Sequence, residues 1–132
     1  MKIDAVRISE QIKEKLHNSS DFKTRNVQFF GISIVICYIA DMTDNDLFNE
    51  SLLNPLLNYD GQIDDNIVDT LKDKVLSNNE VEEFFNLDEA IDNMLTGYSL
   101  LLVDNADRIL SAPSTNIKLY PVNNLSIASS KS

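Results

Sequence analysis

The chain has 132 residues, a length that fits one domain and can bury a core without disulfides or metal. Its formal net charge of −10 repels phosphate backbones and anionic lipid head groups, so neither nucleic acid nor a membrane surface is expected as a direct partner. The longest apolar run, residues 29–40, is about half as long as a membrane span. No membrane insertion by this stretch of chain is therefore predicted.

The first predicted elements are a helix and two strands. Residues 4–17 have helical spacing of apolar side chains, at Val6, Ile8, Ile12 and Leu16. The polar run 18–21 ends this helix. Residues 27–39 are β-branched and aromatic, which predicts two strands meeting near Gly31. The second strand reads as buried on both faces, and such a strand needs helices on both sides.

Two further helices are expected in the middle of the chain. Thr43 is predicted to cap the first, which would place the carboxylates of Asp44 and Asp46 in the opening turn. The apolar positions of this helix are Leu47, Phe48, Leu52, Leu53, Leu56 and Leu57. Pro55 is expected to kink or restart it, because proline lacks the N–H that the helix needs. A turn at 59–61 leads to a helix with Ile67, Leu71 and Val75 at spacing i, i+4 and i+8.

The last third of the chain alternates short strands with one helix. Residues 81–85 predict a strand with Val81, Phe84 and Phe85 as its apolar positions, and Asn86 to Glu89 reads as a capping box. The helix that follows is expected to bury Leu87, Ile91, Met94 and Leu95, with Gly97 left-handed at its end. Strands at 99–103 and 108–111 are predicted to pair antiparallel. The prediction is an α/β fold with a mixed β-sheet of about five strands covered by about four helices. This fold is predicted to form a single domain over residues 1–122, with a polar tail at 123–132.

Residue types that carry catalysis or metal binding are sparse. His17, the only histidine, falls at the exposed end of the first helix, and Cys37 lies within the most apolar strand, where a thiol is inert. The Asp-rich segments 41–46 and 60–65 lack the glycine and glutamate positions of a calcium loop. The three glycines stand too far apart to form a phosphate cradle. No catalytic residue, metal site or cofactor is predicted, and the chain is expected not to be an enzyme but to bind or to couple.

Acidic residues are concentrated in one stretch. No Lys or Arg occurs between residues 26 and 71, whereas Asp and Glu are frequent there. Two interpretations stay open: a solvated face that maintains solubility, or a docking face for a basic partner. The candidate docking residues are Asp44, Asp46, Glu50, Asp64 and Asp65.

An ordered set of short motifs resembles a known family. The set comprises Asn18, Ser19, Ser20 and Asp21 after the first helix, Tyr38 and Asp41 at the end of the apolar strand, Pro55, Gly97, and Asp104. In order and spacing these residues resemble the N-terminal soluble domain of GerA-type spore germination proteins, the A subunits of nutrient germinant receptors. Ala40-Asp41 replaces a usual Asp-Gly, and Asn105 replaces a glycine. Asparagine tolerates positive φ, so the turn at 105 is expected to survive.

The resemblance implies a sensing or signal-coupling role in spore germination. The implied partners are the remainder of the A subunit and the B and C subunits, and a small nutrient germinant is a candidate ligand. The implied location is the spore inner membrane, with this domain, the first subdomain of the N-terminal region, on the cytoplasmic side. No ligand-binding residue is assigned. The alternative is a free-standing cytosolic regulatory domain that docks a basic partner through the acidic face.

Overall fold

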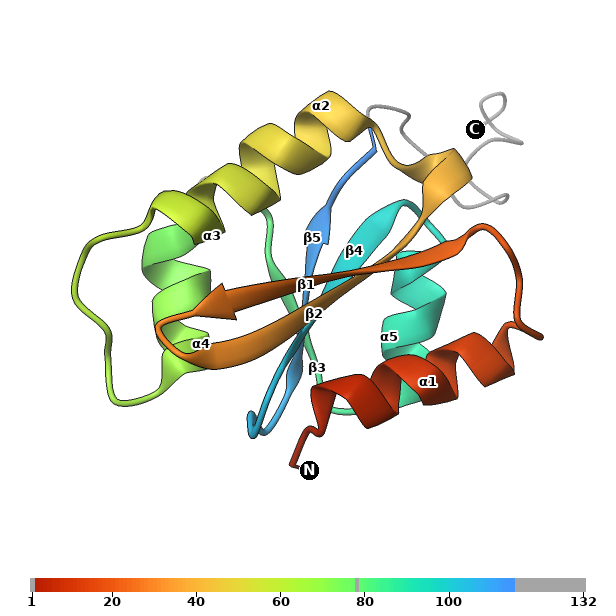
Figure 1. The fold of residues 1–132 in the computed structure, drawn as a ribbon, viewed down its shortest axis with the longest axis horizontal. Coiled ribbons are helices and arrows are strands. Elements are labelled where there is room, and N and C mark those ends of the chain that lie inside the picture. The colour runs from red at the N-terminus through yellow and green to blue at the C-terminus, as the bar shows by residue number, and fades with distance from the viewer. Residues whose placement is uncertain (1, 78, 116–132) are drawn as a thin grey trace, which may run out of the picture.

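A five-stranded sheet forms the centre of the fold (Figure 1). The computed structural model describes residues 2–77 and 79–115. The strands of the sheet follow the order β1-β2-β4-β5-β3. Their bounds are β1 (Phe22–Phe29), β2 (Ile32–Ile39), β3 (Glu82–Phe84), β4 (Tyr98–Val103) and β5 (Ile109–Pro113). The predicted α/β class with about five strands and covering helices is confirmed.

The sheet differs from the prediction in one detail. A mixed sheet was predicted from the order of helices and strands along the chain. All four pairings between the described strands are antiparallel. β2 is nevertheless buried on both faces, because helices cover both sides of the sheet.

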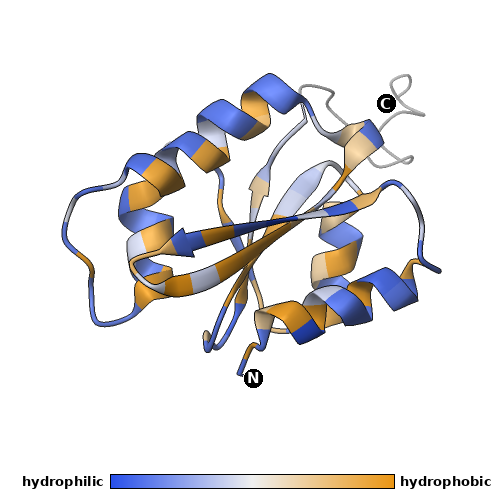
Figure 2. Ribbon diagram, in the orientation of Figure 1, coloured by the Kyte–Doolittle hydropathy of each residue, from blue (hydrophilic) through white to orange (hydrophobic). Residues whose placement is uncertain are grey.

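The helices form two outer layers. α1 (Ala5–Lys15) and α5 (Leu87–Met94) cover one face of the sheet. The other face is covered by α2 (Asn45–Phe48), η2 (Asn49–Leu53) and α3 (Asn54–Asn58), and by α4 (Ile67–Thr70) with η3 (Leu71–Val75). A short η1 (Ala40–Met42) follows β2. Figure 2 shows that these helices turn apolar residues toward the sheet and polar residues outward. In the part of the chain that the structure describes, no helix is long and apolar enough to cross a membrane.

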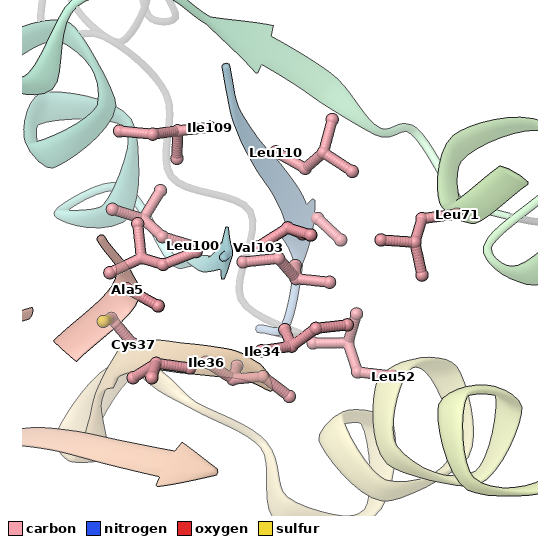
Figure 3. Close-up of a cluster of buried hydrophobic side chains, with 14 of the residues drawn as sticks. Ala5, Ile34, Ile36, Cys37, Leu52, Leu71, Leu100, Val103, Ile109 and Leu110 are labelled. Carbon is pink, nitrogen blue, oxygen red and sulfur yellow. The ribbon is translucent and has the colours of Figure 1, made fainter. Parts of the chain in front are cut away.

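The core lies on both sides of β2 and β4 (Figure 3). Ile34 and Ile36 face the layer that contains Leu52 and Leu71, whereas the neighbouring Cys37 faces α1. This alternation follows from the two-residue period of a strand. All of these side chains are buried, and burial of such apolar surface is the dominant stabilising contribution to a fold of this size.

The β1–β2 hairpin confirms the predicted meeting point at Gly31. Phe30 and Gly31 have φ of 51° and 81°, the geometry of a two-residue turn whose twist matches the strands. β1 begins at Phe22, five residues before the predicted start at Val27. The difference arises because residues 23–26 are exposed on the sheet edge and therefore carry no apolar signal.

For the middle helices, the predicted N-cap was wrong and the predicted restart at Pro55 is confirmed. Asp44, not Thr43, is the N-cap, because its carboxylate accepts a 3.0 Å hydrogen bond from the Leu47 N–H. Thr43 instead donates its hydroxyl to the Ile39 carbonyl at 2.8 Å. Pro55 restarts the helix as predicted, since wide-turn η2 gives way to α3 at this point.

Leu95, which was predicted to be buried, and Phe85, an apolar position of the predicted strand 81–85, are both exposed. Leu95 is 43% exposed because α5 ends at Met94 and Leu95 is its C-cap. Phe85 is 63% exposed because it follows the last residue of β3. Leu71 and Val75 are buried, as their helical spacing in the sequence predicted, and Ile67 packs against the core. The predicted boundary at 122 and the tail 123–132 lie outside the described residues.

Candidate functional site

The motif residues at the start of β1 form a turn that is tied to the end of β2. Asn18 has a φ of 56°, and the Ser19 hydroxyl accepts a 3.3 Å hydrogen bond from the Asp21 N–H. The Asp21 carbonyl then accepts from the Ala40 N–H at 2.8 Å. Ser20 is exposed in this turn. The motif therefore closes the α1–β1 connection against the residue after β2.

Tyr38 and Asp41 lie at the same end of the sheet. The Tyr38 ring packs against Phe48 of α2, with 4.7 Å between the ring centroids. Asp41 is exposed in η1, the single turn between β2 and the next helix. Tyr38 thus anchors α2 to the sheet, whereas the Asp41 carboxylate faces solvent.

Pro55 leaves one carbonyl of its helix without a backbone donor, and a side chain distant in sequence donates to this carbonyl instead. The Ser51 carbonyl lies four residues before Pro55, so the missing proline N–H leaves this acceptor without its helical donor. The Asn79 side chain donates to it at 3.0 Å. The Pro55 position therefore couples the α2–α3 helix to the segment after η3.

Gly97 is required by both backbone geometry and space. Its φ is 106°, and a Cβ built at this position would lie 2.3 Å from Cγ2 of Thr115. The Gly97 carbonyl accepts from the Ser114 N–H at 3.0 Å, and the hydroxyls of Ser99 and Ser114 lie 2.7 Å apart. Gly97 therefore allows residues 114 and 115 to pack against the start of β4.

Asp104 belongs to the opposite end of the sheet, where β4 turns toward β5. Its carboxylate accepts a 3.0 Å hydrogen bond from the Ala5 N–H at the start of α1. The N–H of Asn105 donates to the Ile3 carbonyl at 2.7 Å, and Asn105 has the positive φ, 68°, that was expected of it. Asp104 thus ties the first turn of α1 to the sheet.

The structure separates the motif positions rather than gathering them around one cavity. Residues 18–21, Tyr38, Asp41 and Gly97 lie at one end of the sheet, and Asp104 lies at the other. Most of them have a local role in closing a turn, capping a helix or packing a ring. Any part that they play in ligand binding stays a prediction.

The five candidate docking residues fall into two groups. Asp44 caps α2, Asp46 lies within α2, and Glu50 lies in η2. Asp46 and Glu50 are exposed one helical turn apart. Asp64 and Asp65 lie in the connection between α3 and α4. Asp64 accepts from Lys74 Nζ at 3.0 Å, and this hydrogen bond is the main cause that lowers the pKa of Asp64 below its ordinary value. Whether either group docks a basic partner stays a prediction.

An open acidic hollow of about 510 Å³ lies beside the β4–β5 turn. Asp65 and Asn66 line one side, and Asp104, Asn105 and Asp107 line the other. Across residues 2–77 and 79–115, no group of three or more His, Cys, Asp or Glu side chains is arranged to hold a metal ion. Ile32, Ile67 and Ala106 complete the lining. Typical small-molecule pockets enclose most of the ligand surface, and this hollow is open to solvent instead.

A charged cluster near β3 was missed by the sequence reasoning. Arg108 contacts Glu83 at 2.5 Å and Asp107 at 3.0 Å, and Lys72 reaches Glu83 at 3.1 Å. The hydrogen bond from Arg108 is the main cause that lowers the pKa of Glu83. The exposed Phe85 ring covers this cluster, with the guanidinium 5.6 Å from its centroid. Because the cluster joins three segments that are distant in sequence, no local pattern could have indicated it.

The two residues with potential nucleophile or base chemistry lie apart. Cys37 is fully buried, and desolvation raises the pKa of its thiol to about 12. His17 is exposed just beyond the end of α1, with a φ of 55°. A thiol with such a pKa stays protonated near neutral pH and is a poor nucleophile.

Comparison with known proteins identifies the family. The model of the Bacillus/Clostridium GerA spore germination protein family matches residues 10–125. The chain belongs to the GerA family of spore germination proteins. This match confirms the resemblance inferred from the ordered motifs. No curated protein sequence gives a significant match.

A solved structure shows the same fold. It is the N-terminal domain of the A subunit of the Bacillus megaterium spore germinant receptor GerK3, with a TM-score of 0.71 and 24% sequence identity. The likeness covers 89% of this GerA-family chain and 49% of that domain, so the chain spans about half of its length. At this identity the comparison shows the fold alone. GerA is a spore germination family rather than an enzyme family, and the absence of enzymatic activity stays a prediction.

Proposed function

We propose that this chain is a signal-coupling domain of a nutrient germinant receptor A subunit, which acts in spore germination by docking other parts of the receptor. The observation that carries the proposal is the GerA family match over residues 10–125. The fold shared with an A-subunit N-terminal domain supports it further. The proposed partners are the remainder of the A subunit and the B and C subunits. The proposed location is the spore inner membrane, with the domain on its cytoplasmic side.

Docking is favoured over nutrient binding by the shape of the surface. The hollow beside the β4–β5 turn is open to solvent, and carboxylates and amides from both of its sides line it together with apolar side chains. A small nutrient would be held by an enclosed site that removes most of its surface from water. The motif residues also contact backbone and neighbouring rings within the domain, as Tyr38, Gly97 and Asp104 do.

Co-purification tests the docking role. The full A subunit and a version that lacks residues 2–115 would each be expressed with the B and C subunits and isolated from membranes. We expect the deletion to reduce recovery of the other subunits while the A subunit remains in the membrane. Equal recovery of both subunits with and without the domain would contradict the proposal.

Titration calorimetry separates docking from nutrient binding. Amino acids and sugars would be titrated into the 132-residue chain, and a docking domain should release no binding heat. A saturable heat with any of these nutrients would instead assign a sensing role to the domain.

A further inference from the structure

β1 leaves one edge of the sheet open. It is first in the strand order, and among the described strands it pairs only with β2 (Figure 1). The two-residue turn makes Phe29 and Ile32 the hydrogen-bonded pair next to it, so every second residue of β1 points its N–H and C=O away from β2. These outward residues include Thr24, Asn26 and Gln28. Such an edge is a template onto which another strand can pair.

A groove of about 290 Å³ runs between this edge and α1. Its floor contains Phe22 and Val35, and Val6 beside it is 56% exposed. Thr24 and Asn26 form the strand side of the groove. A strand added to β1 would direct alternate side chains toward this apolar floor.

Unpaired cations flank the open edge on both faces of the sheet. Lys23 and Arg25 are exposed on the face opposite the groove, in register with Tyr38 and Ile36. Lys13 of α1 lines the groove itself, together with Glu10. Within residues 2–77 and 79–115, none of these three cations forms a salt bridge. The cations later in this range all do so, namely Lys72, Lys74 and Arg108.

We propose that the β1 edge binds an extended, acidic polypeptide segment, which adds to the sheet as a sixth strand. Its backbone would satisfy the outward N–H and C=O groups of β1, and its carboxylates would meet Lys23 and Arg25 on one face. Its alternate side chains would point to the other face, toward the apolar floor of the groove beside Lys13. The net charge of −10 repels an acidic chain at long range. At physiological salt this repulsion is screened beyond about 8 Å, so the local cations determine the contact. This surface is independent of the germination role proposed above.

A second copy of the chain fits the edge poorly. Antiparallel pairing of two β1 strands would bring Lys23 and Arg25 of one copy close to the same residues of the other. Like charges directly opposite each other on paired strands are destabilising. The two cations therefore oppose self-pairing and favour a carboxylate-bearing partner.

The test uses a peptide with the length of β1, eight residues, in which Glu alternates with Val. Amide hydrogen exchange of the 132-residue chain would be followed by NMR, with Gln-for-Glu and Lys-for-Glu peptides as controls. We expect the Glu peptide to slow exchange at Thr24, Asn26 and Gln28, and rising salt to weaken the effect. We expect the Gln peptide to bind more weakly and the Lys peptide not to bind.

Variants of the chain separate the contribution of charge to peptide binding from the contribution of backbone hydrogen bonds. Lys23→Glu with Arg25→Glu should weaken binding roughly tenfold. Asn26→Pro removes an outward N–H without touching the bonds to β2, and it should weaken binding by at least as much. Lys72→Glu with Lys74→Glu makes the same change in charge elsewhere and should leave binding unchanged. Unaltered exchange at the outward amides, equal binding of the Glu and Gln peptides, or protection of these amides by self-association would each overturn the proposal.

Discussion

Replacement of Gly97 by alanine should destabilise the domain through two separable effects. At a φ of 106°, an L-residue is strained, which costs about 1–2 kcal/mol. The added Cβ would also lie 2.3 Å from Cγ2 of Thr115, and overpacking of this kind costs about 1–3 kcal/mol. The sum predicts a loss of about 2–5 kcal/mol in the free energy of unfolding, measured by urea denaturation.

A double-mutant cycle separates the two effects. Thr115→Ser keeps the hydroxyl and removes the methyl group that the new Cβ would strike, so it should restore the steric part in the Gly97→Ala background. The backbone strain should remain, and Thr115→Ser alone should change stability by less than about 0.5 kcal/mol. If Gly97→Ala alone changed the free energy of unfolding by less than about 0.5 kcal/mol, the reasoning about this glycine would be refuted.

Three further outcomes follow from the structure. Asp44→Ala should lower the free energy of unfolding by about 1 kcal/mol through loss of the helix cap. Asp46→Ala, at an exposed position, serves as the control. Equal urea midpoints for the two variants would contradict the capping role. Because the pKa of Glu83 is lowered in the folded protein, the unfolded chain binds more protons as pH falls below the ordinary value of 4.5, and stability is lost in that window. Arg108→Met should flatten this part of the pH profile, and an unchanged slope would contradict the assigned pairing. The buried thiol of Cys37, with a pKa of about 12, should not react with a thiol reagent at pH 8 until the protein unfolds; rapid labelling of the folded protein would contradict its burial.

The elements with strong local patterns could be predicted from the sequence. The apolar run of β2 and the turn at Gly31 follow from residue type and spacing alone. Asn86 was correctly predicted to cap α5, since its side chain accepts from the Glu89 N–H at 3.0 Å. The cap of α2 was misplaced by one residue because Thr43 and Asp44 are both good capping residues, and only the fold decides between them.

Features that depend on distant contacts could not be predicted. The polar first half of β1 is a strand only because β2 lies beside it, so its own residues carry no strand signal. The bond from Asn79 to the Ser51 carbonyl and the cluster around Arg108 also join segments that are remote in sequence. The spatial arrangement of the motif residues could not be predicted either, because they form one ordered set along the chain but lie at opposite ends of the sheet.

The germination of spores that carry the altered receptor tests the central claim most directly. Spores whose A subunit lacks residues 2–115 would be compared with unaltered spores over a range of nutrient concentrations, with germination followed as the loss of optical density. A stimulus that does not act through nutrient receptors would serve as the control. A coupling role predicts that the nutrient response is lost while the control response is retained. An unaltered response to every nutrient would contradict the assignment of this domain to nutrient signalling.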